Sequence, residues 1–220
     1  MSDICAFDFE SLSTIESAVI LSMGCAVFKE AWLSELIEDF TPEKCTELFK
    51  KMLDSGLYLK FDVKDQVVNY KRTIDPGTIT WWKGQGDTAK SVLLPSSEDI
   101  SISELENKLQ EFFKYEKNPR LVYSRGNVDM TWYQSVLNHS IKYEGTEKSK
   151  TFPWWSNRDI RTVIDECLMQ ETGKLPPNLE ELVAMNGTFI KHNALHDAAV
   201  DCMNIVIARV VMLGLAGDEE

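Results

Sequence analysis

The order of extended and helical segments constrains the fold of this chain more than any other feature. Residues 4–10 and 18–28 are apolar runs separated by a polar loop, which is typical of neighbouring strands in a central sheet. Residues 193–213 instead repeat apolar side chains at helical spacing, as at Leu195, Ala198 and Cys202. Strands in front of helices predict an α/β protein with a mixed central sheet flanked by helices.

The segments that follow the first two strands give further predictions. Residues 32–40 are expected to form a third strand. Thr41 precedes Pro42, the order expected of a helix cap and first helical residue, so a helix should run to about residue 54. Residues 57–74 are rich in valine, tyrosine and phenylalanine with interleaved charge, which predicts a partly exposed strand or hairpin ending at the turn 75–77.

The second half of the chain is expected to be mainly helical. Residues 80–101 are rich in glycine, serine and charge and predict a long loop or lid. Ser101 and Glu104 form a capping box for a helix that should end near Asn118 and Pro119. The other expected elements are one buried strand and three helices, at residues 121–123, 129–138, 159–171 and 193–213.

The size of the chain suits a single domain. With 220 residues and 25.1 kDa, it can bury one substantial core, so we expect one domain spanning residues 1–220. A hydrophobic content of 44% with only seven prolines lies in the globular range, so the chain should fold.

The net charge restricts how the chain can bind nucleic acid. A charge of −12 disfavours tight passive binding, because phosphate affinity normally rests on lysine and arginine. A hydrolase that brings divalent cations to the phosphate escapes this restriction, since bound metal reverses the local charge.

The cysteines and the N-terminus bear on the compartment. Five cysteines are scattered without metal-ligand spacing, at positions 5, 25, 45, 167 and 202, which fits a reducing cytoplasm. The N-terminus has no signal-peptide pattern, and no apolar run approaches the ~18 residues of a membrane span. We therefore expect a cytoplasmic protein with no membrane partner.

The first strand carries a pair of carboxylates. Asp8 and Glu10 are two residues apart and should share one face of the strand, with Phe9 on the opposite face. An exposed pair is the ordinary interpretation of this pattern taken alone. The neighbouring residues are apolar, however, and buried carboxylates seldom occur without a partner. The pair is therefore a candidate cation site.

A third carboxylate, Asp129, lies where a loop after the strand 121–123 leads into a helix. Taken alone, it is best explained as a helix N-cap. Arg125, close by, is a candidate phosphate ligand, and a surface salt bridge explains it equally well.

The C-terminal cluster offers two pairs with the same spacing, His192 with Asp197 and His196 with Asp201. Five helical residues turn through about 500°, so neither pair shares one face of a continuous helix. If Asn193 caps the helix, His192 lies in the loop before it and Asp197 about one turn inside. This favours His192 with Asp197, and leaves His196 and Asp201 as flanking surface residues.

In this order the motifs resemble those of the DEDD exonucleases with a histidine in the third motif (DEDDh). The matching residues are Asp8, Glu10, Asp129, His192 and Asp197. The superfamily includes oligoribonuclease, ribonuclease T and polymerase proofreading subunits, on a ribonuclease-H-like fold. The chain is most similar to the phage exonuclease A group and its bacterial 3′→5′ exoribonuclease-like relatives, in which counterparts of Trp81–Trp82 and of Asp159 and Arg161 also occur.

The resemblance implies a two-metal mechanism. Asp8 would bridge two ions about 4 Å apart, with Glu10 and Asp197 completing the first site and Asp129 holding the second. Oxygen ligands of this kind suit Mg²⁺ or Mn²⁺. His192 would accept the proton of the attacking water, for which an ordinary pKa near ~6.5 is suitable.

The expected substrate is the 3′ end of DNA, with release of nucleoside monophosphates and with RNA as the rival polymer. Phe9, Trp81, Trp82 and Arg125 are the candidate substrate contacts, the tryptophans by stacking on bases. One of the two adjacent tryptophans should pack in the core, because neighbours cannot face the same way.

Other tryptophan and charged pairs are expected to be structural. Trp154 and Trp155 are assigned to packing, and Asp159 with Arg161 to a buried ion pair. The protein is expected to be a monomer or a homodimer. Two alternatives are a catalytically inactive nucleic-acid-binding module, which would release no product, and a small-phosphoester hydrolase, which would release inorganic phosphate.

Overall fold

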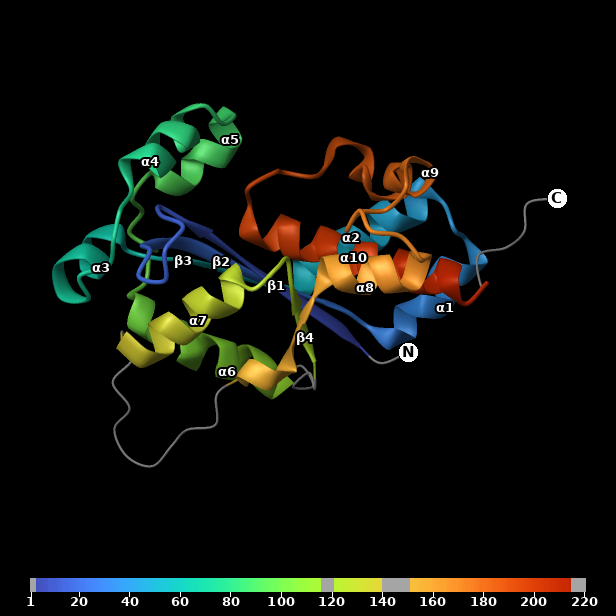
Figure 1. Ribbon diagram of the computed structural model, residues 1–220, viewed down its shortest axis with the longest axis horizontal. Coiled ribbons are helices and arrows are strands. Elements are labelled where there is room, and N and C mark those ends of the chain that lie inside the picture. Colours follow the sequence, from blue (N-terminus) through green and yellow to red (C-terminus); the bar gives the residue numbers. More distant parts are fainter. Residues whose placement is uncertain (1–2, 116–120, 140–150, 215–220) are drawn as a thin grey trace.

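A computed structural model describes residues 3–115, 121–139 and 151–214, and it has a five-stranded mixed sheet at its centre (Figure 1). The strand order is β3-β2-β1-β4-β5, with β1 antiparallel to β2 and parallel to β4. The strands are β1 (Ile4–Ser11), β2 (Ile20–Phe28), β3 (Leu57–Lys60), β4 (Val122–Ser124) and β5 (Asn157–Asp159). This confirms the predicted α/β class and agrees with a ribonuclease-H-like fold.

Helices cover both faces of the sheet. On one face, α10 (Ala194–Met212) lies along β1 and β2, beside α2 (Pro42–Ser55) and α8 (Ile160–Leu168). On the other lie α6 (Leu105–Tyr115) and α7 (Val128–His139). Side chains alternate along β1, so that Ala6 joins the core under α10 and Phe7 joins the opposite core. Asp8 and Glu10 therefore face α10.

The two longest helices begin with the predicted caps. The Thr41 side chain accepts a hydrogen bond from the Lys44 N–H at 3.3 Å at the start of α2. The Asn193 side chain accepts from the N–H groups of Leu195 and His196 at 3.1 and 3.2 Å at the start of α10. Both caps satisfy N–H groups that have no partner inside the helix.

The predicted third strand at residues 32–40 is wrong. The structure has a 3₁₀ turn (Glu30–Trp32) and helix α1 (Leu33–Glu38) here. The reason is the spacing of Leu33, Leu36 and Ile37, which puts all three on one helical face against the core under α10.

The hairpin and lid predicted across residues 57–101 are also wrong for most of their length. After β3 the chain forms α3 (Val63–Asn69), α4 (Pro76–Lys83), α5 (Asp87–Lys90) and the turn Ser91–Leu93. Asp75 caps α4 by accepting from the Thr78 N–H at 2.6 Å, with Pro76 as its first residue. The Asp-Pro pair that indicated a turn is therefore a helix start.

The remaining elements follow the prediction more closely. Ser101 caps the turn Ile102–Glu104 that leads into α6, although its side chain accepts from the Ser103 N–H rather than from Glu104. The predicted end of this helix, near Asn118 and Pro119, lies outside the described residues. Short helical segments complete the chain at Trp154–Ser156, Pro177–Glu180 (α9), Glu181–Val183 and Met185–Gly187. Within the described ranges, no helix is long and apolar enough to cross a membrane.

Candidate active site

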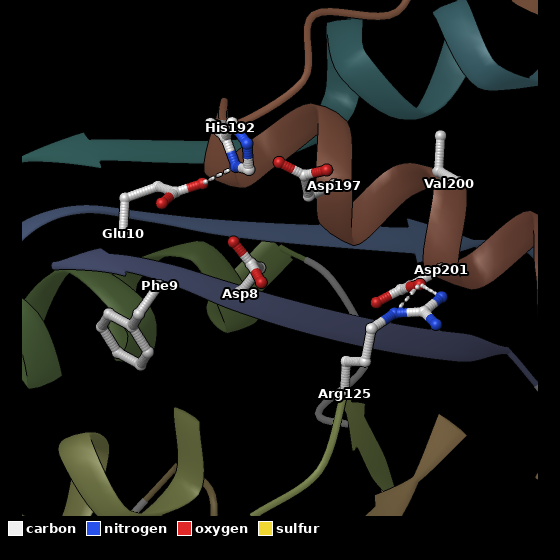
Figure 2. Close-up of a pocket in the computed structure, with 8 residues that line it drawn as sticks. All are labelled: Asp8, Phe9, Glu10, Arg125, His192, Asp197, Val200 and Asp201. Carbon is white, nitrogen blue, oxygen red and sulfur yellow. Dashed lines mark hydrogen bonds and ion pairs between the residues drawn. The ribbon is translucent and has the colours of Figure 1, made fainter. Parts of the chain in front are cut away.

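A polar cavity of about 370 Å³ lies between β1 and the first turns of α10 (Figure 2). Its lining combines carboxylates with one histidine and one arginine: Asp8, Phe9, Glu10, Arg125, His192, Asp197, Val200 and Asp201. Four of the five residues expected to carry the chemistry are in this lining, and the fifth, Asp129, packs directly behind β1.

Strand β1 presents Asp8 and Glu10 to the cavity and turns Phe9 away from it. Glu10 is only 8% exposed. The Phe9 ring is buried on the opposite face of the sheet, 6.0 Å from the Phe7 ring (Figure 2). Phe9 is among the residues that line the cavity, although strand alternation sends its ring into the core, so its contact with substrate stays a prediction.

Asp129 belongs to the first turn of α7 and is 5% exposed. Its Oδ1 accepts a hydrogen bond from the Phe9 backbone N–H at 3.1 Å. The N-cap interpretation is excluded, because α7 begins one residue earlier, at Val128. Asp129 instead joins the start of α7 to β1 at Phe9, the residue between Asp8 and Glu10.

His192 lies in the turn before α10, and Asp197 lies in the first turn of the helix. The His192 backbone is left-handed, with φ of 60°, which costs a non-glycine residue about 1 kcal/mol or more. His192 Nδ1 is 3.7 Å from Glu10 Oε1. Ligand atoms of Glu10, His192 and Asp197 all lie within 4.8 Å of one another, so residues from the two ends of the chain meet at this point.

Burial and mutual repulsion perturb these carboxyl groups. Burial, with the charges of Asp197 and Asp129, raises the pKa of Glu10 to about 8. Burial first, and then the charge of Asp201, raises the pKa of Asp197 to about 7, and burial likewise raises that of Asp129 to about 7. The pKa of Asp8 is raised well above its usual value by burial and by its acidic neighbours. Without a cation the cluster cannot hold its full negative charge at neutral pH.

The side chains present fit a divalent cation. Asp197 Oδ2 is buried and has no hydrogen-bond partner among the described residues, which is costly for a carboxylate oxygen unless another group binds it. The donors around it are carboxylate oxygens, which hard cations such as Mg²⁺ and Mn²⁺ prefer. Asp8, Glu10, Asp129 and Asp197 are the residues that could hold such ions.

A different pair occupies the other end of the cavity. Asp201 is 4% exposed, and its Oδ1 accepts hydrogen bonds from Arg125 Nη2 and, at 3.2 Å, from Arg125 Nε. Asp201 is therefore not the surface residue that the sequence suggested. It lies one helical turn after Asp197, on the same face of α10, so it also points toward the cavity.

The two neighbouring tryptophans separate as expected. Trp82 is fully buried, and its Nε1–H donates to the Ser11 carbonyl at 2.9 Å. Trp81 is 47% exposed, and its ring lies edge-on to the His192 ring with centroids 4.8 Å apart. Trp81 thus forms an exposed aromatic surface beside the catalytic candidates.

Comparison with known proteins identifies the family. A model of the 3′-5′ exoribonuclease Rv2179c-like domain matches residues 4–208. The chain belongs to this family. An exodeoxyribonuclease of Enterobacteria phage T4 is 28% identical over 222 residues, covering 94% of this chain and 89% of that protein. The protein is accordingly a 3′-5′ exonuclease, a hydrolase that acts on nucleic acid, in a family that generally uses divalent metals.

In this exonuclease Asp159 positions the loop that carries Arg125. Its Oδ1 accepts from the Gly126 N–H at 2.9 Å and from the Arg161 N–H at 3.3 Å, and it caps α8. The side chains of Asp159 and Arg161 form no ion pair in the described part of the chain, and Arg161 is exposed. The predicted buried ion pair is wrong, because the carboxylate is used by backbone N–H groups.

Two further expectations about side chains change. His196 is half-buried rather than a flanking surface residue. Its ring lies 5.5 Å from the Phe49 ring, and its Nδ1 accepts from the Ile190 N–H at 3.1 Å, which fastens the turn before His192. Trp155, expected to pack, is 53% exposed. A histidine at the third position of a capped helix was the available signal for His196, since the preceding turn folds back over it.

Proposed function

We propose that this exonuclease uses two metal ions to release nucleoside monophosphates from the 3′ end of DNA, with His192 as the general base. The observation that carries the proposal is the cluster of buried and half-buried carboxylates around Asp197 Oδ2, which has no hydrogen-bond partner among the described residues. In it Glu10 and Asp197 have no lysine or arginine at ion-pair distance within residues 3–115, 121–139 and 151–214.

We assign the metal ligands from the positions of the side chains. Asp8, Glu10 and Asp197 meet in the cavity and would hold one ion, while Asp8 with Asp129 would hold the second. Mg²⁺ or Mn²⁺ suits this all-oxygen set. Bound there, such ions neutralise the carboxylates, lower the pKa of a water and stabilise charge on the phosphate.

His192 suits the role of base. Burial, and then the nearby charge of Lys191, lowers its pKa, so the imidazole is neutral at pH 7 and can accept a proton. Its left-handed backbone aims the ring at Glu10 and the cavity, and strained residues of this kind cluster at functional sites.

Two further residues are assigned to substrate binding. Trp81 is the exposed aromatic ring beside His192, so it would stack on a base near the 3′ end. Arg125 places its positively charged guanidinium at the far end of the cavity, where it would contact a phosphate. Asp201 keeps this guanidinium in place. Trp82 supports Trp81 from the core and does not contact substrate.

The choice of polymer rests on the relatives. The phage T4 relative is named an exodeoxyribonuclease and matches along nearly the whole chain, which favours DNA. The family description names an exoribonuclease, so RNA is the second candidate.

The decisive experiment digests matched 5′-labelled DNA and RNA oligonucleotides with Mg²⁺, Mn²⁺ or EDTA. We expect a ladder that shortens from the 3′ end with either metal, faster on DNA, and no shortening with EDTA. Asp8→Ala and His192→Ala should both lose it. Faster shortening of RNA would show that RNA, not DNA, is the preferred substrate. Full activity of His192→Ala would overturn the assignment of His192 as the general base.

The remaining assignments concern the whole molecule. The five strands of the described residues form one sheet and α10 contacts four of them, so we treat residues 1–220 as one DEDDh exonuclease domain. The described cysteines are free, in keeping with a cytoplasmic location, and a monomer or homodimer is expected.

A further inference from the structure

The backbone of α10 rests directly on Gly24 of β2. A Cβ atom added at Gly24 would lie 2.2 Å from the Ala194 carbonyl carbon and from the Leu195 nitrogen. Non-bonded carbon atoms prefer about 3.5–4.0 Å, so any side chain here would overlap the helix backbone. A side chain is therefore excluded at Gly24 for lack of space. Backbone conformation is not the reason, since Gly24 lies in strand β2 and its φ is not left-handed.

This contact lies between the carboxylates on β1, Asp8 and Glu10, and the carboxylate of Asp197 on α10. Gly24 is the direct strand partner of Asp8. Ala194 and Leu195 lie between His192 and Asp197 in the chain and form the first turn of α10. The distance between the ligands on β1 and those on α10 is thus set where Gly24 meets the helix.

Small side chains continue the same close approach farther along α10. The Cys202 thiol donates weakly to the carbonyl oxygens of Ile4 and Ala26, at 3.4 and 3.5 Å. These contacts link the helix to β1 and β2 together. Any tilt of α10 relative to the sheet would therefore break a Cys202 contact with β1 or with β2.

We propose that Gly24 is a positioning residue that sets the separation of the two ligand groups and so selects the smaller divalent cation. This inference rests on the proposed metal site. Mg²⁺ binds oxygen at about 2.0–2.1 Å and demands near-ideal geometry, whereas Ca²⁺ binds at about 2.3–2.6 Å and tolerates irregular sites. A methyl group at Gly24 would move the first turn of α10 by about 1.3 Å or more, enough to favour the larger ion.

The test is calorimetric titration of wild type and Gly24→Ala with Mg²⁺ and with Ca²⁺, together with the metal-induced shift in Tm. We expect Gly24→Ala to lose about 10- to 100-fold in Mg²⁺ affinity and clearly less in Ca²⁺ affinity. A longer ligand should compensate for the displaced helix, so the double variant Gly24→Ala/Asp197→Glu should regain part of the Mg²⁺ affinity.

Gly56→Ala is the matched control. A Cβ at Gly56 would meet Leu195 Cδ1 at 2.6 Å and the Met52 carbonyl at 2.8 Å. The first is a mobile methyl and the second belongs to α2, so this variant loses stability without displacing the backbone of α10. Its ratio of Mg²⁺ to Ca²⁺ affinity should equal that of the wild type.

The outcomes separate the inference from the proposed site. If the wild type binds neither cation, the proposed metal site fails. If the wild type binds both and Gly24→Ala keeps the same affinity ratio, the site stands and the role of Gly24 is overturned. Should Gly24→Ala not fold, Cys202→Val decides instead: it adds bulk at the same interface, and an unchanged affinity ratio in that variant would likewise overturn the proposal.

Discussion

The two ends of the cavity handle buried negative charge in different ways (Figure 2). At one end Asp201 is paired with Arg125 through two hydrogen bonds. At the other end Glu10 and Asp197 lie close together beside the His192 ring, whose pKa is lowered, and within the described residues neither has a lysine or arginine at ion-pair distance. The first end is therefore balanced by the protein itself, and the second is where we propose that a cation binds.

The comparison teaches how to separate metal ligands from structural carboxylates in one cluster. Burial alone does not distinguish them, since Asp201 and Asp129 are about equally buried, at 4% and 5% exposed. The presence or absence of a positively charged side chain at hydrogen-bond distance does distinguish them. On this criterion we assign Asp201 to holding Arg125 in place, and substitutions should affect the two ends differently.

The largest effect is expected from Asp8→Asn. Loss of this ligand should lower kcat by about a thousandfold or more, because bound metal supplies several kcal/mol of transition-state stabilisation. The metal-free protein should become more stable, since one of several repelling carboxylates is removed. Single-turnover digestion and urea unfolding in EDTA measure the two quantities. Retained activity, or a loss of metal-free stability, would contradict the assignment.

His192→Asn should have the next largest effect. Removal of a general base lowers kcat by about a hundredfold or more, while KM and metal affinity change little. The pH–rate profile should also lose its lower limb, the one set by protonation of the base. His196→Asn is the matched control, because an Asn oxygen can still accept from the Ile190 N–H. A variant at His192 with its lower limb intact would argue for another base.

Strands β1 and β2 and the caps of α2 and α10 could be predicted because their causes are local. Alternation in residues 4–10 placed Asp8 and Glu10 on one face, and Asn193 as cap placed His192 before the helix. Helix α4 was missed because an aspartate followed by proline marks both turns and helix starts. Only the packing of Trp82 under β1 decides between them.

The rest of the site depends on contacts between distant segments. The Gly24 contact with α10 and the burial of Asp201 under Arg125 arise only when the sheet and the helix meet. The residue spacing within a single segment does not predict these two contacts. The i and i+4 relation of Asp197 to Asp201 was the one local signal that both face the cavity.

Asp201→Ala should have a smaller effect, mainly on stability and KM. A hydrogen bond between charged groups is worth about 1.5–3 kcal/mol, and its loss leaves Arg125 without its anchor. The free energy of unfolding should fall by that amount and KM should rise, with kcat nearly unchanged. A double-mutant cycle with Arg125→Ala measures the coupling. A kcat loss as large as that of Asp8→Asn would make Asp201 a metal ligand and erase the difference between the two ends.

The last prediction concerns the pH dependence of stability in the metal-free protein. The folded pKa values of Glu10, about 8, and of Asp129 and Asp197, about 7, exceed the usual carboxyl values near ~4 of the unfolded chain. Between pH 6.5 and 8, roughly, the native state thus binds more protons than the unfolded state, so stability must fall as pH rises, by up to about 1.4 kcal/mol per pH unit for each extra proton. His192 and His196 oppose this trend near the lower end of the window, because their lowered pKa values leave them neutral in the folded state while the unfolded chain still binds protons there. The protonated carboxyl groups outnumber these two histidines, so the net slope keeps its sign. Urea unfolding in EDTA should show the slope, Asp197→Asn should reduce it, and saturating Mg²⁺ should flatten it because the ion replaces the protons. A metal-free protein whose stability rises across this window would mean that the carboxylates are already balanced, and the contrast between the two ends of the cavity would disappear.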